Sequence, residues 1–333
     1  MNTRLVALAA GALMGMATAT PALASPGTGT PPARQYEAVG LGSYQGDFLE
    51  PSALNNHRDV VGKVGSQPFL WRSGKVETLA VLTMGSTGEA LDISDSGHIV
   101  GASTTTDGVQ HAVYWKADGS VWELPGLGGP FSVARQVNEH GVILGEAMDA
   151  DSRWHFVRWD DRVVTDLGAF SGDVSTSGIN GAGQMVGTAP FGASRHAARW
   201  EANGTLTDLG VVAGTTVSWG HAINDHGVAV GQASNGGMGD VTVAFSADGD
   251  KSSVLPVAGG HSATALKINN AGLIIGRTFG GPEESHPTIW VDGVQVDPKS
   301  VGVGAPLIKD LNDNGDLIGG FDDMHAGEAY LYL

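Results

Sequence analysis

The apolar positions of this chain fall into short runs that recur along its length. The clearest run, Ile223 to Gly231, reads INDHGVAVG, in which a polar turn is followed by a short strand of small apolar residues. Six further copies begin at Leu54, Ile93, Val137, Ile179, Ile268 and Leu311. Their closing glycines are 39 to 45 residues apart, and a fixed period in this range is the sequence signature of a repeat architecture.

One repeat contains four short apolar segments separated by Gly, Asn, Asp and Ser, a pattern that predicts strands and turns. In the fourth repeat the segments are VSTSGIN, QMVGTA, RHAARW and TLTDLG, and GAG and EANG form tight turns in which glycine accepts a positive φ. Each repeat is therefore predicted to be a four-stranded antiparallel meander.

One aromatic residue follows the closing glycine of every repeat. These residues are Trp71, Trp115, Trp159, Trp200, Phe245, Trp290 and Tyr332. A ring repeated once per unit is expected to fill the core between neighbouring sheets, and a row of ligand-binding rings is the alternative.

The two ends of the array complement each other. The last repeat stops at EAYLYL (328–333), where a fourth strand is due, and QYEAVGLG (35–42) resembles a fourth strand without its three predecessors. Pairing them closes the ring and removes exposed sheet edges. We predict an all-β, seven-bladed β-propeller of four-stranded antiparallel blades, closed by the N-terminal strand; an open β-helix is the alternative.

The first residues indicate export. Arg4, an apolar run and Ala22-Leu23-Ala24 form the three parts of a signal peptide. We expect residues 1–24 to be a signal peptide, 25–34 a disordered linker and 35–333 a single propeller domain. After cleavage the protein is expected to be secreted (extracellular or periplasmic), monomeric and not inserted in a membrane.

Composition narrows the possible partners. The formal net charge is −17, and the 18 Lys and Arg residues form no cluster, which disfavours nucleic acid. The chain has no cysteine, so a core must stabilise it without disulfides.

The third strands read HAVYW (111–115), HFVRW (155–159), HAARW (196–200) and HPTIW (286–290), and DLG occurs at 166–168 and 208–210. With the Asn-turn-Gly phrase, these motifs resemble the HAF-repeat family of secreted bacterial proteins over essentially the whole mature chain. The resemblance implies an extracellular repeat protein, and it supplies no catalytic residues. No copy contains the complete His-Ala-Phe triplet.

The two faces of the predicted ring differ. One face has short uniform turns, and the other has loops that differ in every repeat, where binding is expected on a rigid scaffold. The large or titratable groups near those loops are Trp154, Phe191, Trp219 and His261. They are candidate ligand-binding residues for a glycan or an extracellular protein, and packing within the loops is the alternative for the two tryptophans.

Charged residues on the innermost strands give an enzymatic alternative. His221 within about 6 Å of Asp92, Asp310 or Arg135 would act as a general base beside a carboxylate or a cation, as in a polysaccharide hydrolase or lyase. Solvated charges in a wet channel explain the same residues without catalysis. Because the sequence contains no GxSxG, HExxH or phosphate loop, enzyme activity is left undecided and a non-catalytic role is preferred.

No cofactor is required by the sequence, although calcium remains an alternative. Asp310, Asn312, Asn314 and Asp316 match the start of a calcium loop, and Phe321 replaces its last carboxylate. The histidines of the third strands belong to different blades, so hydrogen bonding at strand edges is expected of them in place of zinc binding.

Overall fold

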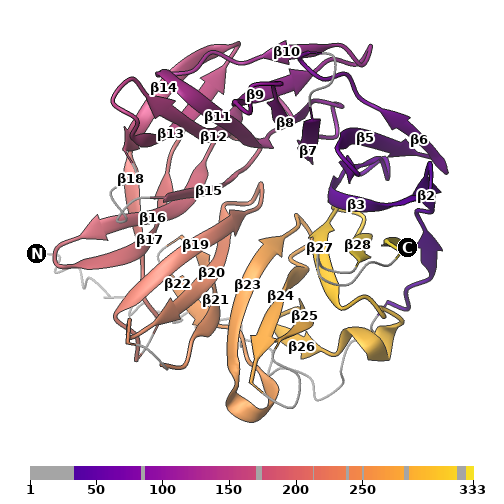
Figure 1. The fold of residues 1–333 in the computed structure, drawn as a ribbon. Coiled ribbons are helices and arrows are strands. Elements are labelled where there is room, and N and C mark those ends of the chain that lie inside the picture. The colour runs from indigo at the N-terminus through magenta and orange to yellow at the C-terminus, as the bar shows by residue number, and fades with distance from the viewer. Residues whose placement is uncertain are drawn as a thin grey trace, which may run out of the picture. The chain divides into compact units, whose positions relative to one another are not determined.

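The computed structural model describes residues 34–83, 87–169, 175–212, 214–237, 240–249, 251–280, 285–320 and 328–333. Over these residues the chain forms seven antiparallel sheets arranged in a ring, with the first strand of each repeat innermost (Figure 1). Two short 3₁₀ helices, η1 (Ala258–Gly260) and η2 (Pro298–Val301), lie between strands. The predicted all-β, seven-bladed propeller is confirmed. The predicted signal peptide and residues 25–33 of the predicted linker lie outside the described residues.

The blades are numbered along the chain. Blade 1 contains β2 (Ser43–Tyr44), β3 (Asp47–Leu54), β4 (Val60–Val64), β5 (Gln67–Arg72) and β6 (Lys75–Thr78). Blade 2 contains β7 (Thr87–Ile93), β8 (Ile99–Thr104), β9 (Gln110–Trp115) and β10 (Val121–Glu123). Blade 3 contains β11 (Gly128–Val137), β12 (Ile143–Asp149), β13 (Trp154–Asp160) and β14 (Val163–Ala169).

The remaining blades follow the same order. Blade 4 contains β15 (Ser175–Ile179), β16 (Met185–Phe191), β17 (Ser194–Trp200) and β18 (Leu206–Gly210). Blade 5 contains β19 (Val217–Ile223), β20 (Val228–Ser234), β21 (Val243–Asp248) and β22 (Lys251–Val254). Blade 6 contains β23 (Ser262–Ile268), β24 (Ile274–Phe279), β25 (Ser285–Val291) and β26 (Val294–Val296). Blade 7 contains β27 (Leu307–Leu311), β28 (Leu317–Gly320), β29 (Tyr330–Tyr332) and β1 (Ala38–Gly40).

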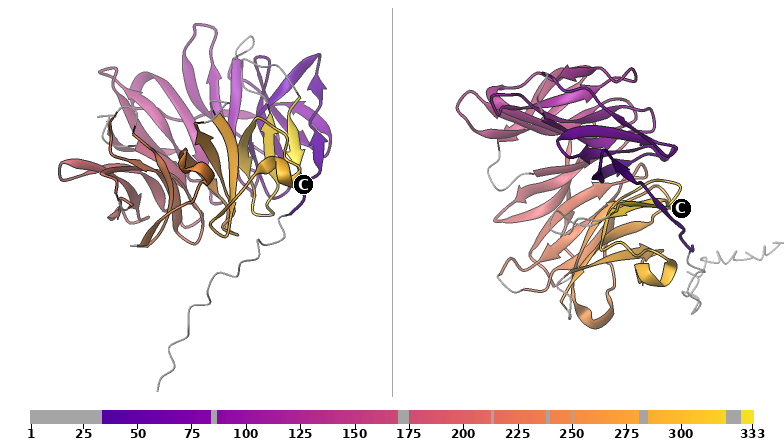
Figure 2. Two further views of the ribbon diagram at one scale, coloured as in Figure 1. Left: turned by 90° about the horizontal axis from the view of Figure 1, so that it is seen from below. Right: turned by 45° about the vertical axis from the view of Figure 1, so that its right-hand side comes forward.

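The ring closes through the N-terminal strand, as predicted. β1 pairs antiparallel with β29, from Ala38 opposite Tyr332 to Gly40 opposite Tyr330. Figure 2 shows the N-terminal strand in indigo entering beside the yellow C-terminal blade. Arg34, the last residue of the predicted linker, bonds to Asp316 in the turn of blade 7 at 2.7 Å.

The asparagine of the repeated phrase joins neighbouring blades. Asn224, for example, is buried, and its Oδ1 accepts the N–H groups of His226 and Val228 within its own turn. Its Nδ2 donates to the Asn269 carbonyl of the next blade at 3.0 Å. Asn55, Asn138, Asn180, Asn269 and Asn312 make the same bond to the next blade at 2.9–3.1 Å. Ser94 takes this place in blade 2 and has no amide to donate.

A second set of bonds runs through the residue after each asparagine. Its side chain accepts the backbone N–H of the preceding blade: Asp95 from Asn56, Glu139 from Asp95, Asp225 from Gly181, Asn270 from Asp225, Asp313 from Asn270, and Asn56 from Asp313, at 2.6–2.8 Å. Gly181 has no side chain, so this set has no acceptor on blade 4 for the Glu139 N–H.

The closing glycine of the phrase is required by close packing. A Cβ on Gly145 would overlap the Val133 carbonyl of the innermost strand and lie 2.7 Å from the Trp159 ring. Gly276 has the same relation to the Thr264 carbonyl and the Trp290 ring. In both blades the innermost strand has a β-bulge opposite this glycine. The repeated phrase is therefore associated with a bulge as well as with a turn.

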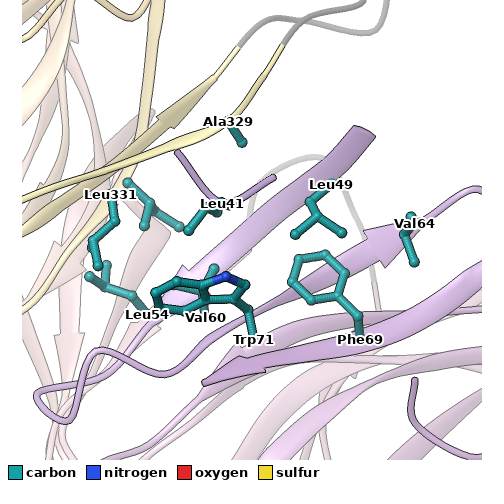
Figure 3. Close-up of a cluster of buried hydrophobic side chains, with 10 residues drawn as sticks. Leu41, Leu49, Leu54, Val60, Val64, Phe69, Trp71, Ala329 and Leu331 are labelled. Carbon is teal, nitrogen blue, oxygen red and sulfur yellow. The ribbon is translucent and has the colours of Figure 1, made fainter. Parts of the chain in front are cut away.

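The core lies between neighbouring blades. The repeated aromatic residue is at most 6% exposed at Trp71, Trp115, Trp159, Phe245, Trp290 and Tyr332, which confirms the structural interpretation of this position there. Figure 3 shows Trp71 packed beside Leu54, with Leu331 of blade 7 near its edge. Trp200 differs, because it remains partly exposed.

Candidate functional site

Strand direction assigns the predicted ligand-binding residues to one face. We call the face with the connections between second and third strands, and between fourth strands and the next blade, the loop face; the opposite face is the turn face. Trp154 begins β13, Phe191 ends β16, Trp219 lies near the start of β19, and His261 directly precedes β23. All four are therefore at the loop-face ends of consecutive blades, 3 to 6.

Two of these residues stack with a neighbouring ring. Trp154 stacks on Phe131 of β11, with ring centroids 6.5 Å apart. Phe191 stacks on His196 of β17 at 5.6 Å, and His196 in turn bonds to Asp208 at 3.0 Å. All four stacked rings are partly exposed. The sequence analysis missed Phe131. Its strand can be recognised from the sequence, but the ring that it stacks on, Trp154, belongs to a different strand.

Trp219 and His261 complete the set on blades 5 and 6. Trp219 is partly exposed and His261 is exposed. The His261 ring lies over Gly280, where an added Cβ would be 3.1 Å from Nδ1. Phe279, which sequence reasoning also missed, ends β24 with 38% of its surface exposed.

The channel candidates divide into two groups. Lys267 Nζ lies 3.4 Å from Asp310 Oδ1. Asp92 and Asp310 each accept a backbone N–H of the next blade, from Val137 at 2.8 Å and Leu54 at 3.0 Å. Burial raises the pKa of Asp92 to about 6, Lys267 acts against that increase and Asp310 adds to it. These three residues, from blades 2, 6 and 7, therefore interact electrostatically.

His221 and Arg135 have other partners. Burial lowers the pKa of His221, and a hydrogen bond with Gln232 partly opposes this change. Its Nε2 is buried without a hydrogen-bond partner. Arg135 pairs with Glu146 of the adjacent strand at 3.0 Å. Among the described contacts, none joins His221 to Asp92, Asp310 or Arg135.

The calcium-loop residues are engaged with the protein itself. Both oxygens of Asp316 accept from arginines, Oδ1 from Arg34 and Oδ2 from Arg58 at 2.9 Å. Asn312 Nδ2 donates to the Asn55 carbonyl, and Asn314 Nδ2 donates to the Asn56 carbonyl at 2.8 Å. Two guanidinium groups on one carboxylate do not fit a calcium loop. Within the described ranges, no group of three or more His, Asp or Glu residues is arranged to hold a metal.

The histidines of the third strands bond to acidic residues within their own blades. His111 pairs with Glu123, His155 with Asp166 and His196 with Asp208, at 2.9–3.0 Å. In blades 3 and 4 the same aspartate also accepts the glycine N–H of the DLG motif. The hydrogen bond to Asp166 raises the pKa of His155. The expected strand-edge hydrogen bonding is confirmed for these three histidines.

Solved structures with a similar fold are propellers from different settings. The β-propeller domain of the trilobed protease from Pyrococcus furiosus has a TM-score of 0.59 at 11% identity, covering 87% of this chain and 94% of that chain. That domain is described as having an open velcro topology, whereas β1 closes the ring here. A chain of the mitotic checkpoint complex has a TM-score of 0.53 at 13% identity, covering 100% of this chain and 99% of that chain.

The extracellular domain of a putative one-component system from B. thetaiotaomicron is also similar, with a TM-score of 0.53 at 9% identity. The match covers 89% of this chain and 39% of that much longer chain. Identities this low show the fold alone. No protein-family model and no curated protein matches the sequence. In the described part of the chain, no helix is long and apolar enough to cross a membrane.

Proposed function

We propose that this protein is a secreted, non-catalytic propeller that binds a neutral glycan through its loop face. The observation that supports this most is the series of rings at the loop-face ends of four consecutive blades. Phe131 and Trp154, Phe191 and His196, Trp219, and Phe279 belong to blades 3, 4, 5 and 6 in turn. An extended polymer crossing these blades meets an aromatic ring at each step.

The chemistry of this face favours a sugar chain over a protein. The rings are distributed over four blades, with one or two in each. A partly exposed aromatic ring presents a flat apolar surface to the C–H face of a sugar. The net charge of −17 opposes a polyanionic chain, so the glycan is proposed to be neutral.

Titration calorimetry of the mature protein with neutral oligosaccharides of four or more units tests this proposal. Trp154→Ala is expected to weaken binding about tenfold, because an aromatic contact contributes on the order of 1 kcal/mol beyond its buried area. Trp122→Ala is the matched control, since Trp122 is 37% exposed on the outer strand β10. Absence of binding, or equal losses in both variants, contradicts the proposal. An extracellular protein then becomes the preferred partner for the loop face.

The channel supports a second candidate, a polysaccharide hydrolase or lyase. The specific observation is a carboxylic acid, Asp92, whose pKa is raised to about 6, as a general acid requires. Release of reducing ends or unsaturated products from polysaccharides, abolished in Asp92→Asn and His221→Asn, would support catalysis. Product formation that is unchanged in both variants excludes this site.

A further inference from the structure

The seam between blades 3 and 4 departs from the packing of the other seams. Trp200 occupies the repeated aromatic position, yet it is partly exposed, whereas Trp115, Trp159 and Trp290 have no exposed surface. The indole N–H groups of those three tryptophans donate to backbone carbonyls in the connection from the preceding blade at 2.6–2.8 Å. Within the described residues, the Trp200 indole makes no such bond.

A groove of 610 Å³ lies beside Trp200. Its apolar lining consists of Leu167, Met185, Ala202 and the Trp200 ring. Its polar lining includes Asp160, Asp166, Glu201 and Asn203. Because residues 201–204 connect β17 to β18, the groove belongs to the turn face, opposite the loop-face rings.

The polar groups around the groove are positioned by neighbours and retain free bonding capacity. Arg199 and Gln184 hold the Glu201 carboxylate at 2.8 and 2.7 Å, and His155 holds Asp166 at 2.9 Å. Arg158 pairs with Asp160 through one terminal nitrogen at 2.9 Å. The Arg158 side chain lines the groove and is 22% exposed.

We propose that this groove binds a neutral saccharide unit, which stacks on Trp200 and hydrogen-bonds to the surrounding carboxylates, Asn203 and Arg158. Sugar hydroxyls donate to the free lone pairs of Asp160 and Glu201. The Trp200 N–H and the part of the Arg158 guanidinium that lines the groove supply donors to sugar oxygens. Each carboxylate already has a cationic or amide partner, so the groove suits an uncharged ligand. This site is additional to the loop-face site and lies on the other face of the ring.

The test uses the mature protein with maltose, cellobiose and diacetylchitobiose, followed by tryptophan fluorescence and calorimetry. At least one disaccharide is expected to bind and to change the fluorescence of the native protein. Trp200→Phe, which keeps a ring but removes the N–H, is expected to abolish that change and to weaken binding at least fivefold. Arg158→Met, which keeps the apolar stem, is expected to weaken binding without removing the fluorescence change.

Two controls separate this proposal from the others. Trp154→Ala alters only the loop face, so it is expected to leave disaccharide binding to the groove unchanged. Near-ultraviolet circular dichroism checks that both groove variants remain folded. The groove proposal is overturned if no disaccharide binds, or if folded Trp200→Phe and Arg158→Met bind as the native protein does. A loss in Trp154→Ala alone would assign the binding to the loop face.

Discussion

Two seams of the same ring are built differently. At the closure seam, between blades 7 and 1, Asp316 is fully buried and accepts hydrogen bonds from Arg34, Arg58 and Asn312. Arg58 stands where six other copies of the turn have glycine, and it takes a positive φ of 64°. At the seam between blades 3 and 4, Gly181 removes one inter-blade acceptor, Trp200 is partly exposed, and cavities of 610 and 210 Å³ adjoin Thr176.

The difference follows from chain connectivity. Blades 3 and 4 are consecutive in the chain, so a looser seam there does not open the ring. The closure depends on β1, whose ladder with β29 joins only three pairs of residues. The Arg34–Asp316 bond ties the segment before β1 to blade 7, and the Arg58–Asp316 bond joins blade 7 to blade 1. The looser internal seam has room for a ligand.

Removing the charged centre of the closure seam is expected to have the largest effect. Asp316→Ala removes a buried carboxylate that accepts three hydrogen bonds, and it should lower the free energy of unfolding by about 2–3 kcal/mol, measured by urea denaturation; the value is limited because both arginines stay partly solvated. Asp151→Ala is the control, because Asp151 is 74% exposed and its loss should cost less than about 0.5 kcal/mol. Equal effects of the two substitutions would contradict the special role of this seam.

The pH dependence of this effect has a defined sign. Burial alone raises the pKa of Asp316, but the bonds from Arg58, Asn312 and Arg34 outweigh it, so the net pKa is lowered. A lowered carboxyl pKa contributes stability above the unfolded value of about 3.9, and that stability is lost as the pH falls through the folded value. The difference between the native protein and Asp316→Ala should therefore shrink in acid.

Asp92 and Asp310 make the same backbone bond at two different seams, and their substitution should change the stability in opposite directions. Burial raises the pKa of Asp92 from 3.8 to about 6, so the ionised side chain destabilises the fold as the pH rises from about 4 to about 6. Asp92→Asn keeps an acceptor for the Val137 N–H and should increase stability at pH 7 by about 1–3 kcal/mol. Asp310→Asn weakens the ion pair with Lys267 and should decrease the stability at pH 7. Thermal unfolding at pH 4 and 7 measures the stability change of each variant. Stability changes of the same sign in the two variants at pH 7 would contradict this assignment.

Serine in place of asparagine tests the inter-blade bonds at the two seams. Asn138→Ser and Asn312→Ser each remove one amide donor, as Ser94 does naturally, and should cost about 1 kcal/mol. Hydrogen exchange is expected to rise more around β15 in Asn138→Ser than around β3 in Asn312→Ser, because the closure seam has other bonds. Equal increases in local hydrogen exchange in the two variants would show that the two seams are equally stable.

Restoring the missing acceptor should give the smallest effect. Gly181→Asn supplies a side chain for the Glu139 N–H at a glycine that does not have a positive φ. The stability gain is expected to be about 0.5–1.5 kcal/mol, from one hydrogen bond and reduced freedom of the unfolded chain. Thermal unfolding measures it, and Gly192→Asn, at a φ of 65°, is a control expected to give no gain. A gain in the control alone would contradict this explanation.

The sequence by itself determined the repeat number, the four strands per blade and the closure by the N-terminal strand. These features follow from local turn residues, apolar period and the complementary ends, all of which can be recognised in one unit. The sequence also predicted that Trp154, Phe191, Trp219 and His261 lie at one face, because strand order alone places them there.

Only the tertiary structure decided which residues meet across blades. The side-chain amide of the asparagine in the repeated phrase donates to a carbonyl about 39–45 residues away. That acceptor cannot be recognised from the residues around the asparagine. Asp92, Lys267 and Asp310 interact because the ring brings blades 2, 6 and 7 to one channel. Trp200 resembles its six counterparts in sequence, but its exposure depends on how the neighbouring blade packs against it, which is a property of the pair of blades.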